Sequence, residues 1–292
     1  MRLASIHTYP VKSCHRIDHG EQPVRVEPWG LAGDRRWLVV DPDGTLVTQR
    51  EVAAMTRIQP VPRPGGLTVR AAGMPDLDVP QPDGAELVDS FVWRTPVRAA
   101  PAGDAAAAWF SAVMARDVRL VWLDDPTRRA VEPAYAAPTD RVSFADGYPL
   151  LLANVASLEK LNGWLAEAGN GWGRVRSARS ERSEYRSREP ESLPMTRFRP
   201  NVVVAGAPAW AEDDWVGRRL RIGTVTFRAP KPCDRCVVTT TDQETGVRGR
   251  EPLRTLGRHR NVDQKLLFGL NLIPDGPYGP IAAGDPVEVL PD

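Results

Sequence analysis

The segment Trp37-Leu38-Val39-Val40-Asp41-Pro42-Asp43-Gly44-Thr45-Leu46-Val47-Thr48 joins two apolar, β-branched runs through a turn sequence. Asp, Pro and Gly are favoured in turns, and the flanking runs have the composition of strands, so the segment predicts a β-hairpin. Similar short runs occur at residues 3–8, 67–70 and 91–94. Short strands at regular spacing, separated by proline-containing turns, favour a small barrel or sandwich.

The next segments predict a helix, a strand and then a break in the chain. A helix is expected at residues 104–115, which begin with an aspartate that can cap the first turn, and a strand is expected at residues 118–123. Residues 124–140 are rich in proline and charge, as domain boundaries often are. The chain is long enough for two domains, which we expect at residues 1–125 and 126–292.

The second half has the pattern of a mostly β domain with one or two helices. Asn154 can cap a helix that Gly169 would end. Strand-like runs follow at residues 201–205, 220–227, 235–241 and 287–290. The absence of a Gly-x-Gly-x-x-Gly or Walker-type loop argues against a nucleotide fold. We therefore expect a mostly β fold with some α (α+β), in which a barrel-like N-terminal domain precedes a β-rich second domain.

Composition limits the partners and the compartment. The formal net charge of +1 gives no global field that would attract nucleic acid or an anionic membrane. Three cysteines, an odd number, argue against a secreted disulfide framework and fit a reducing compartment. The first residues lack the apolar run of an export signal, and no window approaches the ~18 consecutive apolar residues of a membrane span. We expect a soluble, cytoplasmic protein with no nucleic-acid or membrane partner.

Residues 174–191 carry Arg, Ser and Glu with almost no large apolar side chain. Such a segment cannot bury enough surface to order itself, which predicts a flexible loop. Its arginines also suit nucleic-acid binding, but the interleaved glutamates argue against that alternative.

The stretch Lys231-Pro232-Cys233-Asp234-Arg235-Cys236 places two of the three cysteines beside cationic side chains. A thiolate is the form of cysteine that attacks or binds a metal, and Lys231 and Arg235 would both favour it. Three other interpretations stay open: a zinc knuckle, which would need a second ligand pair, a thioredoxin-like redox pair, and a buried pair without chemistry. The β-branched residues 237–241 predict a strand, whereas a redox pair is expected between a strand and a helix.

Four segments taken together resemble one family. They are Tyr9-Pro10-Val11-Lys12-Ser13-Cys14, Gly33-Asp34-Arg35-Arg36-Trp37, Phe198-Arg199-Pro200-Asn201 and the run from Cys233 to Gly246. In this order they resemble two-part MOSC proteins, a class named for the C-terminal domain of molybdenum-cofactor sulfurases, and in particular the mitochondrial amidoxime-reducing component and its bacterial relatives. The resemblance implies an N-terminal MOSC-type β-barrel domain followed by a MOSC domain.

The resemblance also implies a bound molybdenum–molybdopterin cofactor. Cys236 matches the cysteine that ligates the metal, a role that suits a soft thiolate. Asp146 matches a carboxylate close to the metal, which could shuttle protons, although an aspartate in a turn before Gly147 fits the sequence equally well. Cys14 and Cys233 match family positions without a ligand role, and we expect both to be structural.

The remaining matched positions would hold the organic part of the cofactor. Lys12, Ser13 and Arg35 match the residues that bind its phosphate, with a point charge, a hydroxyl and a forked donor. Arg199 and Asn201 match residues that line the pterin, where a planar donor and an amide can bind ring nitrogens and carbonyls. Judged on sequence alone, the three phosphate-type residues would instead be surface or turn residues.

The function that the resemblance implies is the reduction of small N-hydroxylated compounds such as hydroxylamines, amidoximes or hydroxylated nucleobases. No cysteine follows Cys236, so no fused iron–sulfur domain is expected and electrons would come from a separate protein. Two alternatives stay open: a non-catalytic carrier of the cofactor or of a persulfide on Cys236, and a structural β protein with an inert cysteine pair.

Overall fold

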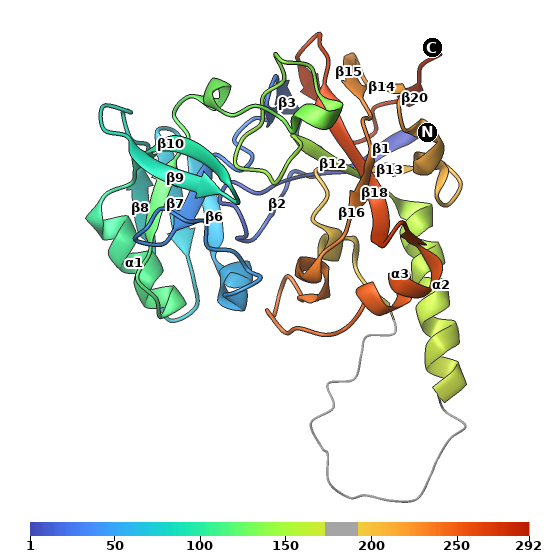
Figure 1. The fold of residues 1–292 in the computed structure, drawn as a ribbon, viewed down its shortest axis with the longest axis horizontal. Coiled ribbons are helices and arrows are strands. Elements are labelled where there is room, and N and C mark those ends of the chain that lie inside the picture. Colours follow the sequence, from blue (N-terminus) through green and yellow to red (C-terminus); the bar gives the residue numbers. More distant parts are fainter. Residues whose placement is uncertain (173–191, 292) are drawn as a thin grey trace, which may run out of the picture.

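The structure, a computed structural model, describes residues 1–172 and 192–291. The loop expected at residues 174–191 lies outside the described residues. The described chain forms two strand-rich lobes side by side (Figure 1). The fold is mostly β with some α, as the sequence predicts. No helix in the described part of the chain is both long and apolar enough to cross a lipid bilayer.

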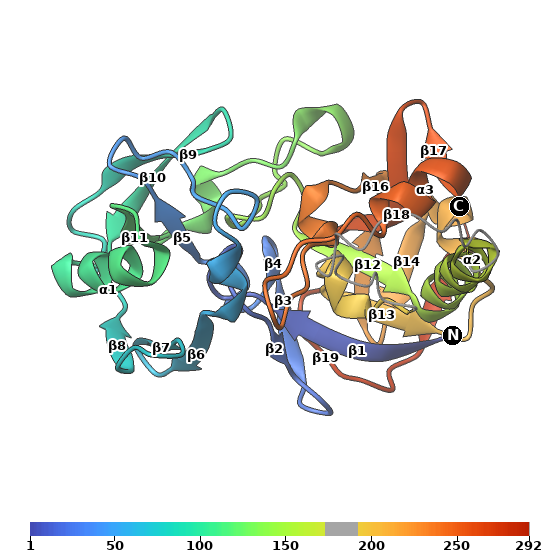
Figure 2. The ribbon, with the colours of Figure 1, turned by 90° about the horizontal axis from the view of Figure 1, so that it is seen from below.

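The first lobe consists of short antiparallel strands and one long helix. One sheet has the order β5-β11-β10-β9, and a second has the order β6-β7-β8. The helix α1 (Asp104–Met114) lies on the outer side of this lobe (Figure 2). The strands are β5 (Trp37–Val40), β6 (Gln59–Arg63), β7 (Gly66–Arg70), β8 (Leu77–Pro80), β9 (Val88–Val92), β10 (Thr95–Pro101) and β11 (Arg119–Trp122).

The second lobe is built on a large sheet of order β2-β1-β13-β12-β18-β15-β14-β20, with β16 and β17 paired to β18. Helices α2 (Val155–Trp172) and α3 (Leu253–His259) lie in this lobe (Figure 1). Its strands are β1 (Arg2–Thr8), β2 (Ile17–Asp18), β12 (Leu150–Asn154), β13 (Val202–Ala205), β14 (Arg219–Ile222), β15 (Val225–Arg228), β16 (Pro232–Asp234), β17 (Asn261–Val262), β18 (Lys265–Pro274) and β20 (Val287–Val289). A small sheet joins β3 (Val24–Glu27), β4 (Gly30–Leu31) and β19 (Pro280–Ile281).

The chain starts in the second lobe and only then enters the first. Strand β1 pairs antiparallel with β13, with Ile6 opposite Val202, and β3 pairs with β19 near the C-terminal end of the sequence. The first strands thus contribute to sheets that later segments complete. The domain limits at residues 1–125 and 126–292 stay a prediction.

The hairpin predicted at residues 37–48 is only partly formed. Strand β5 is present, and the N–H of Val47 donates to the carbonyl of Val39 at 2.8 Å, but residues 45 and 46 make only isolated bridges. The turn packs tightly against β9: a Cβ at Gly44 would lie 2.4 Å from the Asp89 carbonyl oxygen, and Gly44 has a φ of +80°. Only glycine fits this backbone and this close approach.

The predicted helices are present, with different ends. The side-chain oxygen of Asn154 accepts the N–H of Ala156 at 3.2 Å and caps α2 as expected, but the helix continues past Gly169 to Trp172. The N-cap of α1 is Gly103, without a side-chain hydrogen bond, and Asp104 lies in the first turn. A carboxylate there still interacts favourably with the helix dipole.

Residues 235–241 do not form the predicted strand. Residues Val237–Thr240 form a 3-10 helix instead. The hydroxyl of Thr239 donates to the carbonyl of Cys236 at 2.9 Å, and that of Thr240 donates to the carbonyl of Val237 at 2.8 Å. Threonine side chains that bond nearby carbonyls offer the backbone an alternative to a sheet ladder, which overrides the β propensity of this run. The predicted strand at residues 220–227 is a hairpin of β14 and β15.

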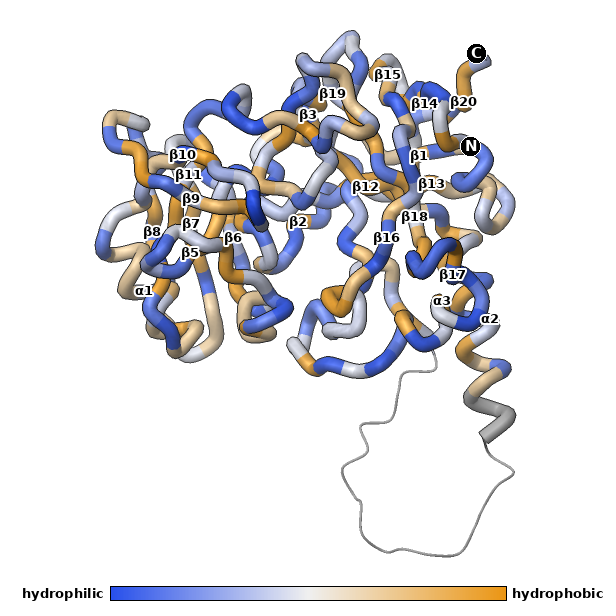
Figure 3. Tube along the Cα trace, in the orientation of Figure 1, coloured by the Kyte–Doolittle hydropathy of each residue, from blue (hydrophilic) through white to orange (hydrophobic). Residues whose placement is uncertain are grey.

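Each lobe has its own apolar core, and the strands that form it appear as hydrophobic segments in Figure 3. In the first lobe, Phe110 of α1 is fully buried in a cluster with Trp37, Met55 and Leu120. In the second lobe the large sheet buries a cluster that includes Ile6.

The variant Phe110→Ala is expected to lower the free energy of unfolding by about 3–5 kcal/mol, because it removes a fully buried ring and leaves a cavity. Urea denaturation followed by circular dichroism measures this loss. The control Ala108→Ser changes an exposed position of the same helix and should shift the stability by no more than about 0.5 kcal/mol. Equal midpoints for the two variants would contradict the assignment of Phe110 to the core.

Candidate functional site

A cavity of about 360 Å³ is lined by residues of both lobes. All the candidate site residues from the sequence lie along it: Lys12, Ser13, Arg35, Asp146, Arg199, Asn201 and Cys236. The pairing of β1 with β13 explains part of this convergence. Residues 9–13 follow β1 and residues 198–201 precede β13, so antiparallel pairing places both segments at the same end of the strand pair.

Lys12 and Asp146 form an ion pair within the cavity wall. The Lys12 ammonium donates to Asp146 Oδ1 at 2.6 Å and to the carbonyl oxygen of Phe144 at 2.7 Å. Burial lowers the pKa of Lys12 to about 8, although the Asp146 carboxylate opposes the shift. Burial would raise the pKa of Asp146, but Lys12 outweighs it and, with Arg50 and Trp93, holds that pKa below its usual value. Although protein surrounds Asp146, its side chain is 61% exposed, because it opens onto the cavity.

Two arginines lie over the ring of the fully buried Tyr9. The guanidinium carbons of Arg35 and Arg199 lie 4.5 Å and 4.1 Å from the ring centroid. Arg35 pairs with Asp34 and donates to the Asn201 side-chain oxygen at 3.1 Å. Burial opposes the charge on Arg35, but Asp34 outweighs burial and raises the pKa of Arg35. Burial lowers the pKa of Arg199 to about 10.

Three of the cofactor-type residues have left-handed backbone conformations. The φ angles are +69° at Ser13, +49° at Arg35 and +52° at Arg199. For residues with a Cβ this conformation costs about 1–2 kcal/mol each and persists only where the surroundings impose it. Such strain is typical of functional sites, and here all three residues line one cavity.

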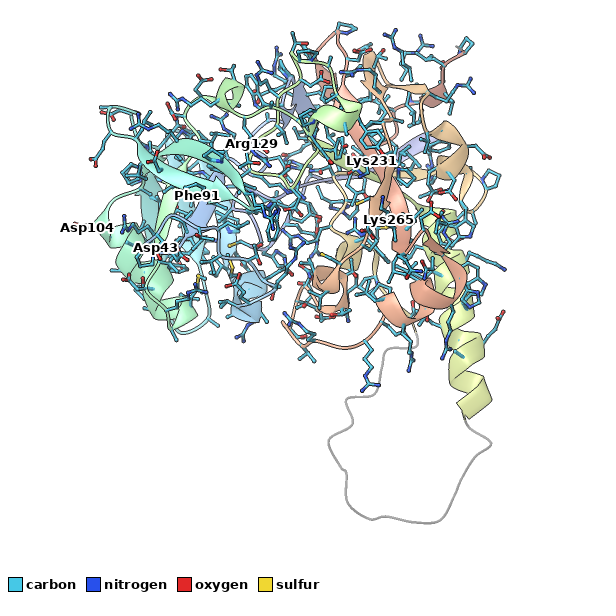
Figure 4. The ribbon with its side chains drawn as sticks, viewed as in Figure 1. Asp43, Phe91, Asp104, Arg129, Lys231 and Lys265 are labelled. Carbon is cyan, nitrogen blue, oxygen red and sulfur yellow. The ribbon has the colours of Figure 1, made fainter. Side chains whose placement is uncertain are left out.

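Each cysteine of the Cys-x-x-Cys pair contacts a different arginine. Arg50 Nη2 lies 3.1 Å from Cys236 Sγ, and Arg235 Nη1 lies 2.9 Å from Cys233 Sγ. Lys231 was expected to support a thiolate; instead its ammonium lies 5.2 Å from the ring centroid of Tyr135. Figure 4 shows Lys231 in the second lobe, near β16 and β18.

Cys14 is not among the residues that line the cavity, although its carbonyl accepts a hydrogen bond from Arg199 at 3.0 Å. It is fully buried, and burial raises the pKa of its thiol to about 12, so it stays a thiol at neutral pH. Cys233, in contrast, lines the cavity together with Cys236. Across residues 1–172 and 192–291, no group of three or more His, Cys, Asp or Glu side chains is placed to hold a metal ion, so a zinc knuckle finds no ligand set there.

Three residues that the sequence motifs do not indicate also shape the site. Arg129 donates to the carbonyl oxygens of Ser143, Ala145 and Asp146 at 2.5, 2.5 and 2.6 Å and so fixes the loop that carries Asp146. It lies where the two lobes meet (Figure 4). Arg50 and Trp93 line the cavity from the first lobe. Neither belongs to a recognisable motif, so only the fold reveals them.

Fold and cavity define a two-part β protein in which a thiol and several cationic side chains meet at one site. Residues 1–117 match the MOSC N-terminal beta barrel domain, and residues 139–288 match the MOSC domain. The chain belongs to the MOSC family.

Named relatives cover nearly the whole chain. Human mitochondrial amidoxime-reducing component 1 is 32% identical over 308 residues, which cover 99% of this chain and 82% of that protein. Mitochondrial amidoxime reducing component 2 of Bos taurus is 29% identical, with 98% and 82% covered. Molybdenum cofactor sulfurase of Anopheles gambiae is 32% identical over 93% of this chain, but over only 34% of its own length.

The donor set fits a molybdenum cofactor that ends in a phosphate. Lys12 uses two of its three N–H donors in the contacts above, which leaves one for a phosphate oxygen. Ser13 and Arg35 line the same cavity and can add a hydroxyl and further guanidinium donors. Cys236 provides the soft sulfur that a metal at the other end of such a ligand needs.

Anion binding at Lys12 is expected to weaken as the pH rises. With a pKa of about 8, Lys12 is mostly charged at pH 7, and only about a tenth of it stays protonated at pH 9. Sulfate keeps its charge over this range, so its affinity for cofactor-free protein, measured by calorimetry, should fall between these pH values. Lys12→Arg keeps the charge and should flatten the profile. If the sulfate affinity of the wild type and of Lys12→Arg falls equally with pH, Lys12 does not control anion binding in this cavity.

Proposed function

We propose that this MOSC protein binds the molybdenum cofactor and reduces small N-hydroxylated compounds. The observation that carries the proposal is the convergence of Cys236 with Lys12, Ser13 and Arg35 on one cavity, although Cys236 comes late in the sequence and the other three come early. A soft metal ligand and a set of phosphate-type donors in one cavity are what such a cofactor needs. The relatives named amidoxime-reducing components support the reaction class.

In the proposed reaction the N–O bond of the substrate breaks, and two electrons and two protons convert the N–OH group into N–H and water. When bound, the cofactor would supply the metal that accepts the oxygen of the substrate. Cys236 would hold that metal, and Lys12, Ser13 and Arg35 would hold the phosphate. Asp146 stays ionised beside Lys12 and is open to the cavity, so its carboxylate would accept a hydrogen bond from the water that delivers protons to the leaving oxygen.

Electrons would come from a separate donor protein. The sequence contains three cysteines, fewer than the four that an iron–sulfur cluster normally uses. Cys14 is fully buried, and Cys236 is assigned to the molybdenum. A cytoplasmic location and a soluble state belong to the same proposal.

A non-catalytic carrier is the second candidate. The similarity to a molybdenum cofactor sulfurase favours it, because a protein that handles the cofactor or its sulfur could use the same cavity and the same thiol. The two functions differ in turnover. Only the reductase should convert benzamidoxime to benzamidine when reduced methyl viologen is supplied.

Protein made in a host that synthesises molybdopterin is expected to contain close to one molybdenum per chain. Elemental analysis and the fluorescence of the pterin released on denaturation measure the occupancy. Arg35→Ala should lower the occupancy while the cofactor-free fold persists, because the lost contact belongs to the ligand. Zinc in place of molybdenum, with no pterin released, would refute the cofactor assignment.

The two cysteines of the pair should differ in activity assays. Cys236→Ser replaces a soft ligand with a hydroxyl and should lower N-hydroxyl reduction by more than about 100-fold, beyond the typical effect of outer-shell substitutions. Cys233→Ser should keep most of the activity, since that sulfur is not assigned to the metal. Equal losses would favour a redox or zinc pair, in which either partner is essential.

A further inference from the structure

Arg50 lines the cavity, and the surrounding protein neutralises little of its positive charge. Among the described residues, the Arg50 guanidinium bonds the Cys236 sulfur, a weak acceptor, and no carboxylate lies within ion-pair distance of it. Asp146 is close enough to feel its charge but bonds Lys12 instead. Lys12 and Arg35, in contrast, each have a carboxylate partner. A guanidinium carries five N–H donors, so most of those on Arg50 are available to a ligand.

Trp93 holds the Arg50 guanidinium in place. The guanidinium carbon of Arg50 lies 4.2 Å from the centre of the Trp93 ring, and Trp93 Nε1 donates to Asp146 Oδ1 at 3.1 Å. From the other side, Arg248 Nη2 donates to the carbonyl oxygens of Gln49 and Arg50, both at 2.9 Å. The stack fixes the guanidinium of Arg50, and the contacts of Arg248 fix the backbone. The cation is therefore held in position before a ligand binds.

The position of Trp93 is not explained by packing. The residue lies at the turn between β9 and β10 with a φ of +58°, and it is 41% exposed. A left-handed conformation at a bulky residue and an exposed indole are both unfavourable. Both make sense if the ring serves as a surface for a ligand at the cavity wall.

The charge of the cavity favours an anion. Its lining includes the cations Lys12, Arg35, Arg50, Arg199 and Arg235 and the carboxylates Asp146 and Asp234. Lys12 and Arg35 are assigned to the phosphate end, and Arg199 and Arg235 bond protein oxygens. Arg50, next to Cys236, is therefore the cation best placed for a substrate group.

We propose that Arg50 and Trp93 form a subsite that selects N-hydroxylated substrates carrying a carboxylate or a similar anionic group on a flat ring. The inference rests on the proposed reductase function and narrows its substrate class. The planar guanidinium can bind a carboxylate through two parallel hydrogen bonds, and the indole can stack on the ring. Cys236 lines the same cavity, where we place the N–OH group of such a substrate.

The test compares benzamidoxime with para-carboxybenzamidoxime, using holoenzyme and reduced methyl viologen. For the wild type, the KM of the carboxylated substrate should be lower by about tenfold or more, as a charge-assisted hydrogen bond provides. A second readout does not depend on turnover: the Kd values of the two amidine products, from tryptophan fluorescence, should differ in the same direction. Equal or reversed ratios in the wild type would overturn the proposal.

Three variants locate the source of the preference. Arg50→Gln should bring the KM and Kd ratios close to one. Trp93→Leu should weaken both compounds while the preference for the carboxylate largely persists. Arg94→Gln removes an exposed cation next to Trp93 that does not line the cavity and should keep the wild-type ratio. If Arg94→Gln lowers the KM and Kd ratios as much as Arg50→Gln does, the preference comes from the overall positive charge of the region, and the subsite is refuted.

The experiment also separates this inference from the proposed function. If neither substrate is reduced but the carboxylated product binds more tightly, and only Arg50→Gln abolishes that difference, the subsite stands and the reductase function fails. If both substrates are reduced with equal KM, the reductase function stands and the subsite fails.

Discussion

The antiparallel pairing of β1 with β13 is the constraint on which the site depends. It joins the start of the chain to a strand about two hundred residues later. Tyr9 and its neighbours leave β1 next to the segment that enters β13, and the Tyr9 hydroxyl donates to the carbonyl of Pro200 at 3.0 Å. Because β1 belongs to the sheet of the second lobe, the segment with Lys12 and Ser13 is anchored before the chain enters the first lobe. Sheet pairing thus sets the position of the residues proposed to bind the anion.

The network around Tyr9 explains how strained residues stay in place. Arg35 and Arg199 both lie over its ring, and the backbone N–H of Tyr9 donates to Asp34 Oδ1 at 2.7 Å. Asp34 in turn pairs with Arg35. Two like charges next to one ring repel each other, yet each has a separate set of oxygen partners and a share of the negative face of the ring. The donors are therefore held in position before a ligand arrives, which lowers the entropy cost of binding.

The sequence predicted local structure well where one periodic pattern dominated. The strands near residues 3–8 and 67–70 and the helix near residues 104–115 are present within a few residues. The 3-10 helix after Cys236 was missed because threonine hydroxyls bond the preceding carbonyls, a local effect that strand propensity does not include. Residues of the four segments that resemble the family converge on the cavity, because the fold brings these backbone segments together there. Arg50 and Trp93 were out of reach, since their contacts with Cys236 and Asp146 are purely tertiary.

The contacts of the two thiols give the first lobe a direct part in the site. Arg235, which contacts Cys233, lies two residues away in the same segment. Arg50, which contacts Cys236, belongs to the first lobe. Arg248 of the second lobe bonds the backbone at Arg50 and so links the two lobes there. The surroundings of Cys236 are therefore complete only when both lobes are docked, whereas those of Cys233 are local. This asymmetry agrees with the proposal that the second cysteine of the pair, and not the first, would hold the metal.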